Sequence, residues 1–342
     1  MHLSLTQATL LKLALIASFS QASLALVAQS TAQTPVDPTL SGSSPTADQS
    51  AAPSSSAAAA GRARGSGGDR KQAKPYVPVF LTDGEPDWSG FWRPNPGGDT
   101  YDITGKRPRP DFNLQGDGTR KSGTPRITGT PDGVVPYLPP AKAHYQDLVD
   151  HIDTPTKPEY VDTQAHCLPN GPGRVFIHSG FEIIQTPGYV VFLSEANDEH
   201  IVVPIDAGPH LASDVHLWEG DRRGHWEGNN TLVVDVANVK GKSRLDMSGD
   251  FYGPETHFTE RYTRVDDSTI KYEAIVTDPS IYAQPWTLNI RFKRSHDDDP
   301  TYEVWEDACH EGERSADRLV VSANAQKKME EAAKQAEQTQ KP

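Results

Sequence analysis

The amino-acid sequence predicts an all-β domain with one helix, in which an antiparallel meander closes into a β-barrel. Short apolar segments follow one another from residue 181 to residue 293, and turn sequences such as Pro187-Gly188 and Gly228-Asn229-Asn230 separate them. Successive short strands joined by such turns are typical of β-sandwiches and β-barrels. We favour the barrel because closing a sheet removes its exposed edges.

The amino-terminal segment has the features of an export signal. Residues 13–19 and 24–28 are apolar, polar residues interrupt them, and small-x-small cleavage options follow. We therefore expect residues 1–32 to be a cleavable signal peptide and the protein to be exported, either periplasmic or secreted. A retained anchor is the alternative, although no stretch reaches the roughly 20 apolar residues of a transmembrane span.

Two further segments lack any pattern that would support packing. Residues 33–74 are dominated by Ser, Ala, Gly, Pro, Thr and Gln, and residues 322–342 are polar, with Met329 their only large apolar residue. Burial cannot offset the entropy lost in ordering such segments. We predict a disordered tether and a disordered tail, which leave a single domain over residues 75–321.

The domain opens with a strand and one helix. Trp88 and Trp92 flank Gly90, which indicates a first strand with large rings to bury. Residues 94–136 are rich in Gly, Pro, Asp and Arg, and they predict a long irregular excursion over the surface. After Pro139 a helix is predicted that packs on the sheet or plugs one of its ends. Its apolar face consists of Ala141, Tyr145, Leu148 and Ile152.

The remaining apolar segments predict strands. Pro187-Gly188 suits a type II turn between the first two. The clearest alternation gives one apolar face to residues 286–293, formed by Trp286, Leu288, Ile290 and Phe292. The expected strands are residues 181–186, 189–195, 200–205, 224–227, 231–236, 256–265, 269–277, 286–293 and 302–309.

The strand at residues 256–265 carries the strongest candidate for chemistry. Its alternation puts Phe258, Glu260, Tyr262 and Arg264 on an inward face and His257 on the opposite face. A buried carboxylate must be paired or neutral, and either state suits acid–base work. A structural ion pair between Glu260 and Arg264 is the alternative.

Glu182 and His257 complete the catalytic candidates. Glu182 shares a strand face with Ile184, and two inward carboxylates can act as acid and base. The pattern does not show whether Glu182 meets Glu260. His257 joins Glu260 only if a β-bulge turns it inward.

Charge and motifs argue against several partners. With 33 Lys and Arg against 46 Asp and Glu, the net charge is −13, which repels nucleic acid. No phosphate-binding loop, dinucleotide fingerprint or nucleophile elbow is present, so no cofactor is predicted. The metal-ligand spacing H-E-x-x-H is absent too, and no metal site is predicted from His210, His216, His225 and His257.

Cys167 and Cys309 are the only cysteines. Two cysteines in an exported chain suggest a disulfide. Buried free thiols are the alternative, and a zinc site is not expected because no C-x-x-C spacing occurs.

Several motifs resemble those of a large group of uncharacterised exported bacterial proteins. The similar stretches run in order from Trp88 to about Gly312, although Glu313-Arg314 replaces the Asn-Tyr usual in the group. The motifs are Cys167-Leu168-Pro169, Glu182-Ile183-Ile184-Gln185-Thr186-Pro187-Gly188-Tyr189-Val190-Val191, Trp226-Glu227-Gly228-Asn229-Asn230-Thr231-Leu232-Val233-Val234-Asp235, His257-Phe258-Thr259-Glu260-Arg261, Asp278-Pro279 with Tyr282 and Pro285-Trp286-Thr287, and Cys309-His310-Glu311-Gly312. Gly90-Phe91-Trp92 also resembles the G-x-W of lipocalin and calycin barrels, which implies a lipocalin-like barrel that holds a ligand.

Three functions follow from this fold. The first is an exported protein that binds an apolar or aromatic small molecule. The second is an enzyme without cofactor, a lyase, isomerase or hydrolase that uses the barrel carboxylates and histidine. The third is a structural envelope protein whose barrel is filled by its own side chains. The expected ligand-binding residues are Phe258, Tyr262, Arg264, Trp218 and Tyr282.

Overall fold

The computed structural model describes residues 74–95, 101–107, 124–197, 199–299, 301–305, 309 and 315–339. The predicted signal peptide (residues 1–32) and all but the last residue of the predicted tether (residues 33–74) lie outside these ranges. Within the described ranges, no helix is both long enough and apolar enough to cross a membrane.

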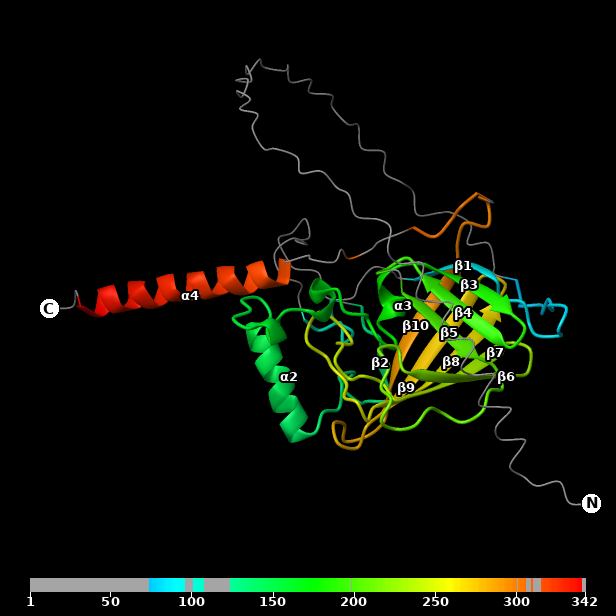
Figure 1. Ribbon diagram of the computed structural model, residues 1–342, viewed down its shortest axis with the longest axis horizontal. Coiled ribbons are helices and arrows are strands. Elements are labelled where there is room, and N and C mark those ends of the chain that lie inside the picture. Colours follow the sequence, from blue (N-terminus) through cyan, green and yellow to red (C-terminus); the bar gives the residue numbers. More distant parts are fainter. Residues whose placement is uncertain are drawn as a thin grey trace, which may run out of the picture. The chain divides into compact units, whose positions relative to one another are not determined.

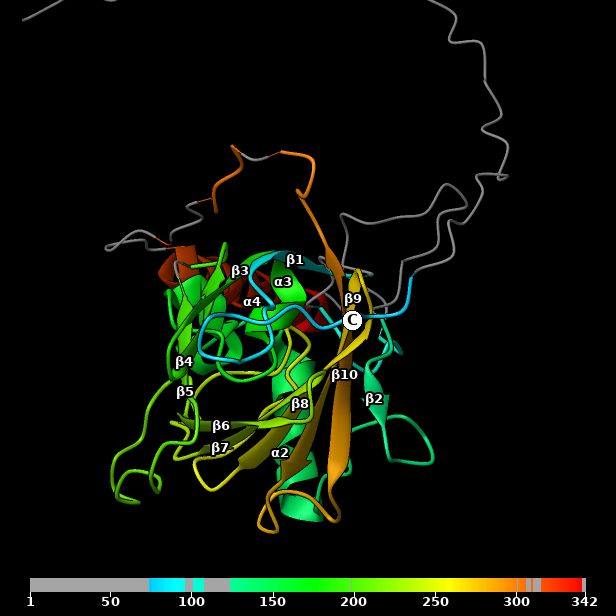
Figure 2. The ribbon, with the colours of Figure 1, turned by 90° about the vertical axis from the view of Figure 1, so that its right-hand side faces the viewer.

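One sheet dominates the domain, and its strands follow the order β5-β4-β3-β1-β10-β9-β8-β7-β6, with β2 (Ile127–Thr128) paired to β10. All the strand pairings are antiparallel, and the predicted meander is confirmed. Figure 2 shows β4 and β5 on one side of the barrel and β9 and β10 on the other. The strands are β1 (Gly90–Pro94), β3 (Phe181–Thr186), β4 (Tyr189–Ser194), β5 (His200–Pro204), β6 (Asp221–Glu227), β7 (Thr231–Ala237), β8 (His257–Asp266), β9 (Thr269–Thr277) and β10 (Trp286–Arg294).

The two end strands of this order nearly close the barrel. Ile205, just after β5, forms a parallel bridge with Gly224 of β6, and the Asp206 N–H donates to the Gly224 carbonyl at 2.8 Å. A Cβ at Gly224 would lie 2.6 Å from Val203 Cγ1 and 2.8 Å from Ile205 Cδ1. The close approach of β5 and β6 therefore requires glycine at this position.

Apolar side chains at every second position along the strands fill the interior of the barrel. On β10, Trp286, Leu288, Ile290 and Phe292 are all at most 2% exposed, as predicted, while Arg291 is exposed. The short helix α3 (Val175–His178), drawn beside β1 and β3 in Figure 1, adds Phe176 to this interior. The ring of Phe176 lies 5.3–5.8 Å from five other rings, those of Phe181, Phe192, Tyr262, Tyr272 and Phe292.

The predicted helix is present as α2 (Pro139–His151), but α2 does not plug the barrel. Its Tyr145 ring stacks on Tyr137 at 5.3 Å. Its Leu148 packs against Gly249, where an added Cβ would lie 3.3 Å from Leu148 Cβ. The plug is α3 instead. Two 3₁₀ turns follow α2, η1 (Pro158–Tyr160) and η2 (Thr163–His166).

Three predictions about the outer segments were wrong. Residues 301–305 form no strand, although a strand was expected over residues 302–309. The excursion at residues 94–136 is not confined to the surface, because Asp102 and Ile103 are fully buried. The tail expected to be disordered, residues 322–342, is helical as far as Thr339 in α4 (Ser315–Thr339).

The physical reason for α4 lies in its composition. The segment is rich in Ala, Glu, Gln and Lys and contains neither Gly nor Pro, so its intrinsic helix propensity is high. The prediction gave more weight to the small apolar surface that the tail could bury than to this propensity. Some burial does occur, since Ala316 is 4% exposed, and Asn324 Nδ2 donates to the Thr156 carbonyl at 3.0 Å.

Candidate functional site

Glu260 of β8 is the centre of a polar network inside the barrel. Its side chain is fully buried, and its Oε2 accepts hydrogen bonds from Arg222 Nη1 at 2.5 Å and Tyr262 Oη at 2.7 Å. Tyr272 Oη donates to Oε1 at 2.9 Å. Burial and the charge of Glu260 raise the pKa of both tyrosines well above the usual value, so both stay protonated donors.

The partner of Glu260 is Arg222 of β6, and the predicted pair with Arg264 was wrong. Arg264 Nη2 donates to the Asp267 carbonyl at 2.9 Å, and its guanidinium lies 4.6 Å from the Tyr76 ring and 4.8 Å from the Trp92 ring. Residues four apart on a strand are separated by about 13 Å, so Arg264 cannot reach Glu260 along β8. Arg222 was missed because the β6 sequence around it lacks an apolar alternation.

A carboxyl pair, Glu199 and Glu219, extends the network, and consecutive backbone amides hold it. The Asn170 N–H donates to Glu199 Oε1 at 2.7 Å, and the Gly171 N–H donates to Glu219 Oε1 at 2.8 Å. The second oxygen of each carboxyl is buried and has no hydrogen-bond partner, and the two carboxyls lie close enough for the charge of Glu219 to raise the pKa of Glu199. A hydrogen bond between two carboxyls needs a proton on one of them.

The charges in the network agree with one shared proton. Arg222 balances the charge of Glu260, and its Nη2 lies 3.9 Å from Glu219 Oε2. Burial, followed by the charge of Glu219, raises the pKa of Glu199 to about 8. Burial also raises the pKa of Glu219, against the lowering effect of Arg222. At neutral pH the Glu199 carboxyl of this pair therefore holds a proton.

The raised pKa of Glu199 predicts how stability depends on pH. An unfolded Glu has a pKa of about 4.3, so the folded state binds the extra proton more tightly. The stabilisation is complete below pH 4.3 or so and is lost as pH rises through about 8. We expect this pair to lower the free energy of unfolding by roughly 2–4 kcal/mol between about pH 5 and pH 9.

Glu199→Gln is the variant that isolates this effect, because its amide keeps the side chain neutral at every pH. Urea denaturation of the wild type and the variant at a series of pH values gives, for each protein, the slope of the free energy of unfolding against pH. As pH rises from about 5 to about 9, the free energy of unfolding should fall much less in the variant than in the wild type. Equal slopes for the two proteins would mean that Glu199 holds no extra proton.

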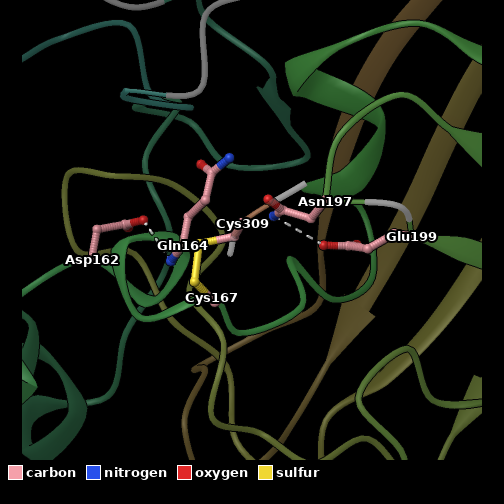
Figure 3. The surroundings of a disulfide bond; sticks show 6 residues. All are labelled: Asp162, Gln164, Cys167, Asn197, Glu199 and Cys309. Atoms are coloured by element: carbon pink, nitrogen blue, oxygen red, sulfur yellow. Dashed lines mark hydrogen bonds between the residues drawn. A yellow bond between two sulfur atoms is a disulfide. The ribbon is translucent and has the colours of Figure 1, made fainter. Parts of the chain in front are cut away.

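The predicted disulfide is present and lies close to Glu199. Cys167 and Cys309, 142 residues apart in sequence, have their Cα atoms 5.4 Å apart. Figure 3 shows the bond between Gln164 of η2 and the pair Asn197 and Glu199, where Asn197 Nδ2 donates to Glu199 Oε1 at 3.4 Å. The disulfide thus ties the segment after the barrel to the loop that carries the amides of Asn170 and Gly171.

The other two catalytic candidates lie outside the barrel. Glu182 is half-buried on the outer face of β3, between the inward Phe181 and Ile183, so the expectation that it points inward was wrong. It does not meet Glu260. His257 also faces outward, where its Nε2 lies 2.7 Å from Asp235 Oδ1, and the described register has no bulge at its end of β8.

The expected ligand-binding residues are not brought together around one cavity. Phe258 is buried against Tyr252. Tyr282 is buried in the segment just before β10, and its Oη donates to the Phe251 carbonyl at 2.9 Å. Trp218 lies in the loop before β6, with Lys240 Nζ 4.8 Å from its ring. A common pocket for these residues is therefore not supported.

Two clefts of about 580 Å³ each lie on either side of α2, outside the barrel interior. The first cleft is lined by Lys106, Arg107, Val135, Tyr137, Lys142, Tyr145 and Asp250, among others. The second cleft is lined by His144, Leu148, Arg244, Phe251 and Tyr252, among others. Neither lining includes Glu260, and no residue of either cleft was singled out as a site residue from the sequence.

No protein-family model, no curated protein and no solved structure matches the chain.

Proposed function

We propose that the chain is an exported protein that binds a small aromatic or apolar molecule with an anionic group, and that the ligand occupies the first cleft. The barrel fold is compatible with ligand binding, and a cleft of about 580 Å³ is within the size range of small-molecule sites. The observation that carries the proposal is the combination of an aromatic wall and a cationic rim in this cleft.

The aromatic wall comes from α2 and the segment before it. Tyr137 and Tyr145 stack at 5.3 Å with an interplanar angle of 26°, and Phe251 also stacks on Tyr137, at 5.1 Å. Val135, 6% exposed, continues the apolar surface. Stacked rings held in place by their neighbours offer a rigid face to another ring.

The cationic rim consists of Lys106, Arg107 and Lys142. Lys106 Nζ donates to the Asp132 carbonyl, and Arg107 Nη1 donates to the Ser248 carbonyl at 2.7 Å. Both keep further N–H donors, since a lysine has three and an arginine five. Burial and Asp246 raise the pKa of Asp250 well above the usual value. With Asp250 neutral, the described lining holds the three cations Lys106, Arg107 and Lys142 against one other carboxyl group, that of Asp132.

The other two functions have less support at their expected locations. Catalysis by the barrel carboxylates needs access to Glu260, which is fully buried among Arg222, Tyr262 and Tyr272. A structural barrel agrees with the packing of Phe176, but that function leaves the first cleft without a role. Membership of the group of exported bacterial proteins that the motifs resemble remains part of the proposal.

A pair of matched probes tests the proposal. The full mature chain is titrated with 2-naphthoate and with the neutral 2-naphthalenemethanol, and binding is followed by fluorescence. We expect naphthoate to bind about tenfold more tightly, which corresponds to about 1.4 kcal/mol. Tyr145→Ala should weaken both probes about tenfold, and Lys142→Ala should weaken naphthoate alone.

The matched control is Tyr189→Ala, because Tyr189 is an exposed tyrosine of the β3–β4 hairpin outside the cleft. Its affinities should equal those of the wild type. Absence of saturable binding, or equal effects of Tyr145→Ala and Tyr189→Ala, would rule the first cleft out as the binding site.

A further inference from the structure

A basic segment borders the second cleft. After β7 the chain reads Lys240-Gly241-Lys242-Ser243-Arg244, and the last four of these residues belong to the lining of the cleft. Gly241 has a φ of 62°, and a Cβ there would clash with the backbone nitrogen of Pro254, so the sharp turn at this point requires glycine. An antiparallel bridge between Arg244 and Phe251 fixes the far end of the segment. The turn and the bridge thus hold two cationic side chains at one cleft.

Arg244 is buried without a carboxylate as a direct partner. It is only 5% exposed. Its Nη2 donates to the Glu159 carbonyl, and its Nη1 donates to the Tyr160 carbonyl at 3.5 Å. These carbonyls are neutral, and an arginine has five N–H donors. The two bonds therefore leave both the charge and further donors of Arg244 unmatched.

The two carboxylates whose charges attract Arg244 are engaged with other donors. Asp162 accepts from Arg174 Nη1 and Nη2 at 3.0 and 2.9 Å, and Asp246 Oδ2 accepts the Ile103 N–H at 3.0 Å. Burial, aided by the like charge of Arg174, outweighs the attraction of both carboxylates and holds the pKa of Arg244 below its usual value. A buried cation in this state favours an anion that comes from outside the chain.

The rest of the lining adds more positive than negative charge. Lys242 is exposed at the same cleft, and His144 of α2 and His166 of η2 contribute imidazole rings. Glu159 supplies the only carboxyl group in the described lining, and its Oε1 lies 3.5 Å from Lys157 Nζ outside the lining. An anion that enters the second cleft therefore meets two cations and one carboxylate that already has a counter-charge.

We propose that the second cleft binds a phosphate group, with Arg244 and Lys242 as the residues that hold it. The planar fork of arginine matches two phosphate oxygens, and lysine adds a compact point charge. The volume of about 580 Å³ exceeds that of a phosphate ion, and Leu148 and Val161 add apolar surface to the lining. The site therefore has room for inorganic phosphate or for the phosphate of a small organic molecule.

Titration calorimetry of the full mature chain with inorganic phosphate and with n-butyl phosphate tests the proposal. Ionic strength is held constant, because salt screens an exposed lysine. We expect one saturable site for each probe. Lys242→Ala should weaken both about five- to tenfold, and Arg244→Lys should weaken both at least tenfold, because it keeps the charge but loses the fork. Tighter binding of butyl phosphate would assign the site to a phosphorylated organic molecule, and equal binding would assign it to inorganic phosphate.

The control is Lys240→Ala, because Lys240 lies on the same segment but contacts the Trp218 ring, 4.8 Å away, and is not part of the lining. Its phosphate affinity should equal that of the wild type. Lys242 is exposed, so Lys242→Ala keeps the test valid even if Arg244→Lys fails to fold. The proposal is wrong if the wild type shows no saturable phosphate binding, or if Lys242→Ala and Lys240→Ala have the same affinity.

Discussion

Glu260→Gln is expected to destabilise the folded protein by about 3–5 kcal/mol, because it leaves the buried Arg222 without its closest counter-charge. The amide keeps the shape of the side chain, so no cavity contributes to the loss. The hydroxyls of Tyr262 and Tyr272 also lose a charged acceptor. For a domain of this size the melting temperature should fall by roughly 10 °C.

The variant should also change its behaviour with pH. The Glu199–Glu219 pair can release its shared proton and so supply a second negative charge near Arg222, which lies 3.9 Å from Glu219. The cost of Glu260→Gln is therefore expected to be smaller at about pH 9 than at about pH 6. Chemical denaturation at both pH values measures the difference.

Glu227→Gln is the matched control, since Glu227 also pairs with an arginine. Arg261 donates to both oxygens of Glu227, at 3.1 and 2.6 Å, but this pair is exposed on the outer face. Exposed pairs contribute about 1 kcal/mol or less. If Glu260→Gln melts at the wild-type temperature, the network does not stabilise the fold, and an acid–base role for Glu260 regains support.

The fold was predictable where one physical rule governs the chain. Hairpin turns and two-residue alternation located most of the strands, and burial on β10 follows the predicted face residue by residue. The helical spacing of Tyr145 and Leu148 located α2 within a residue or two. The disulfide followed from having only two cysteines. The prediction failed at α4, where propensity rather than apolar periodicity decides the structure.

The site was less predictable because its residues come from segments without a shared pattern. Glu260 was found because its strand alternates, but Arg222, Glu199 and Glu219 lie at strand ends or in loops, where no periodicity shows which way a side chain points. The error at Glu182 has a different cause. The strand and its alternation were predicted correctly, but the face that Glu182 shares with Ile184 was taken as the inward one, whereas the inward face of β3 holds Phe181 and Ile183.

Phe176→Ala is expected to cost about 3–5 kcal/mol and to open a cavity inside the barrel. Phe176 is 1% exposed, and its five neighbouring rings lie on β3, β4, β8, β9 and β10. Rings from five strands cannot all collapse into the space that one ring leaves. A dry apolar cavity of this kind binds small apolar molecules such as benzene.

The experiment compares thermal melts of Phe176→Ala with and without benzene, and Phe80→Ala is the control because Phe80 is 50% exposed. Phe80→Ala should cost under about 1 kcal/mol and show no effect of benzene. Benzene should raise the melting temperature of Phe176→Ala and leave the wild type unchanged, since Phe176 already fills that space. Stabilisation of the wild type by benzene would instead reveal a cavity in the native barrel, and the ligand would then belong in the interior rather than in the first cleft.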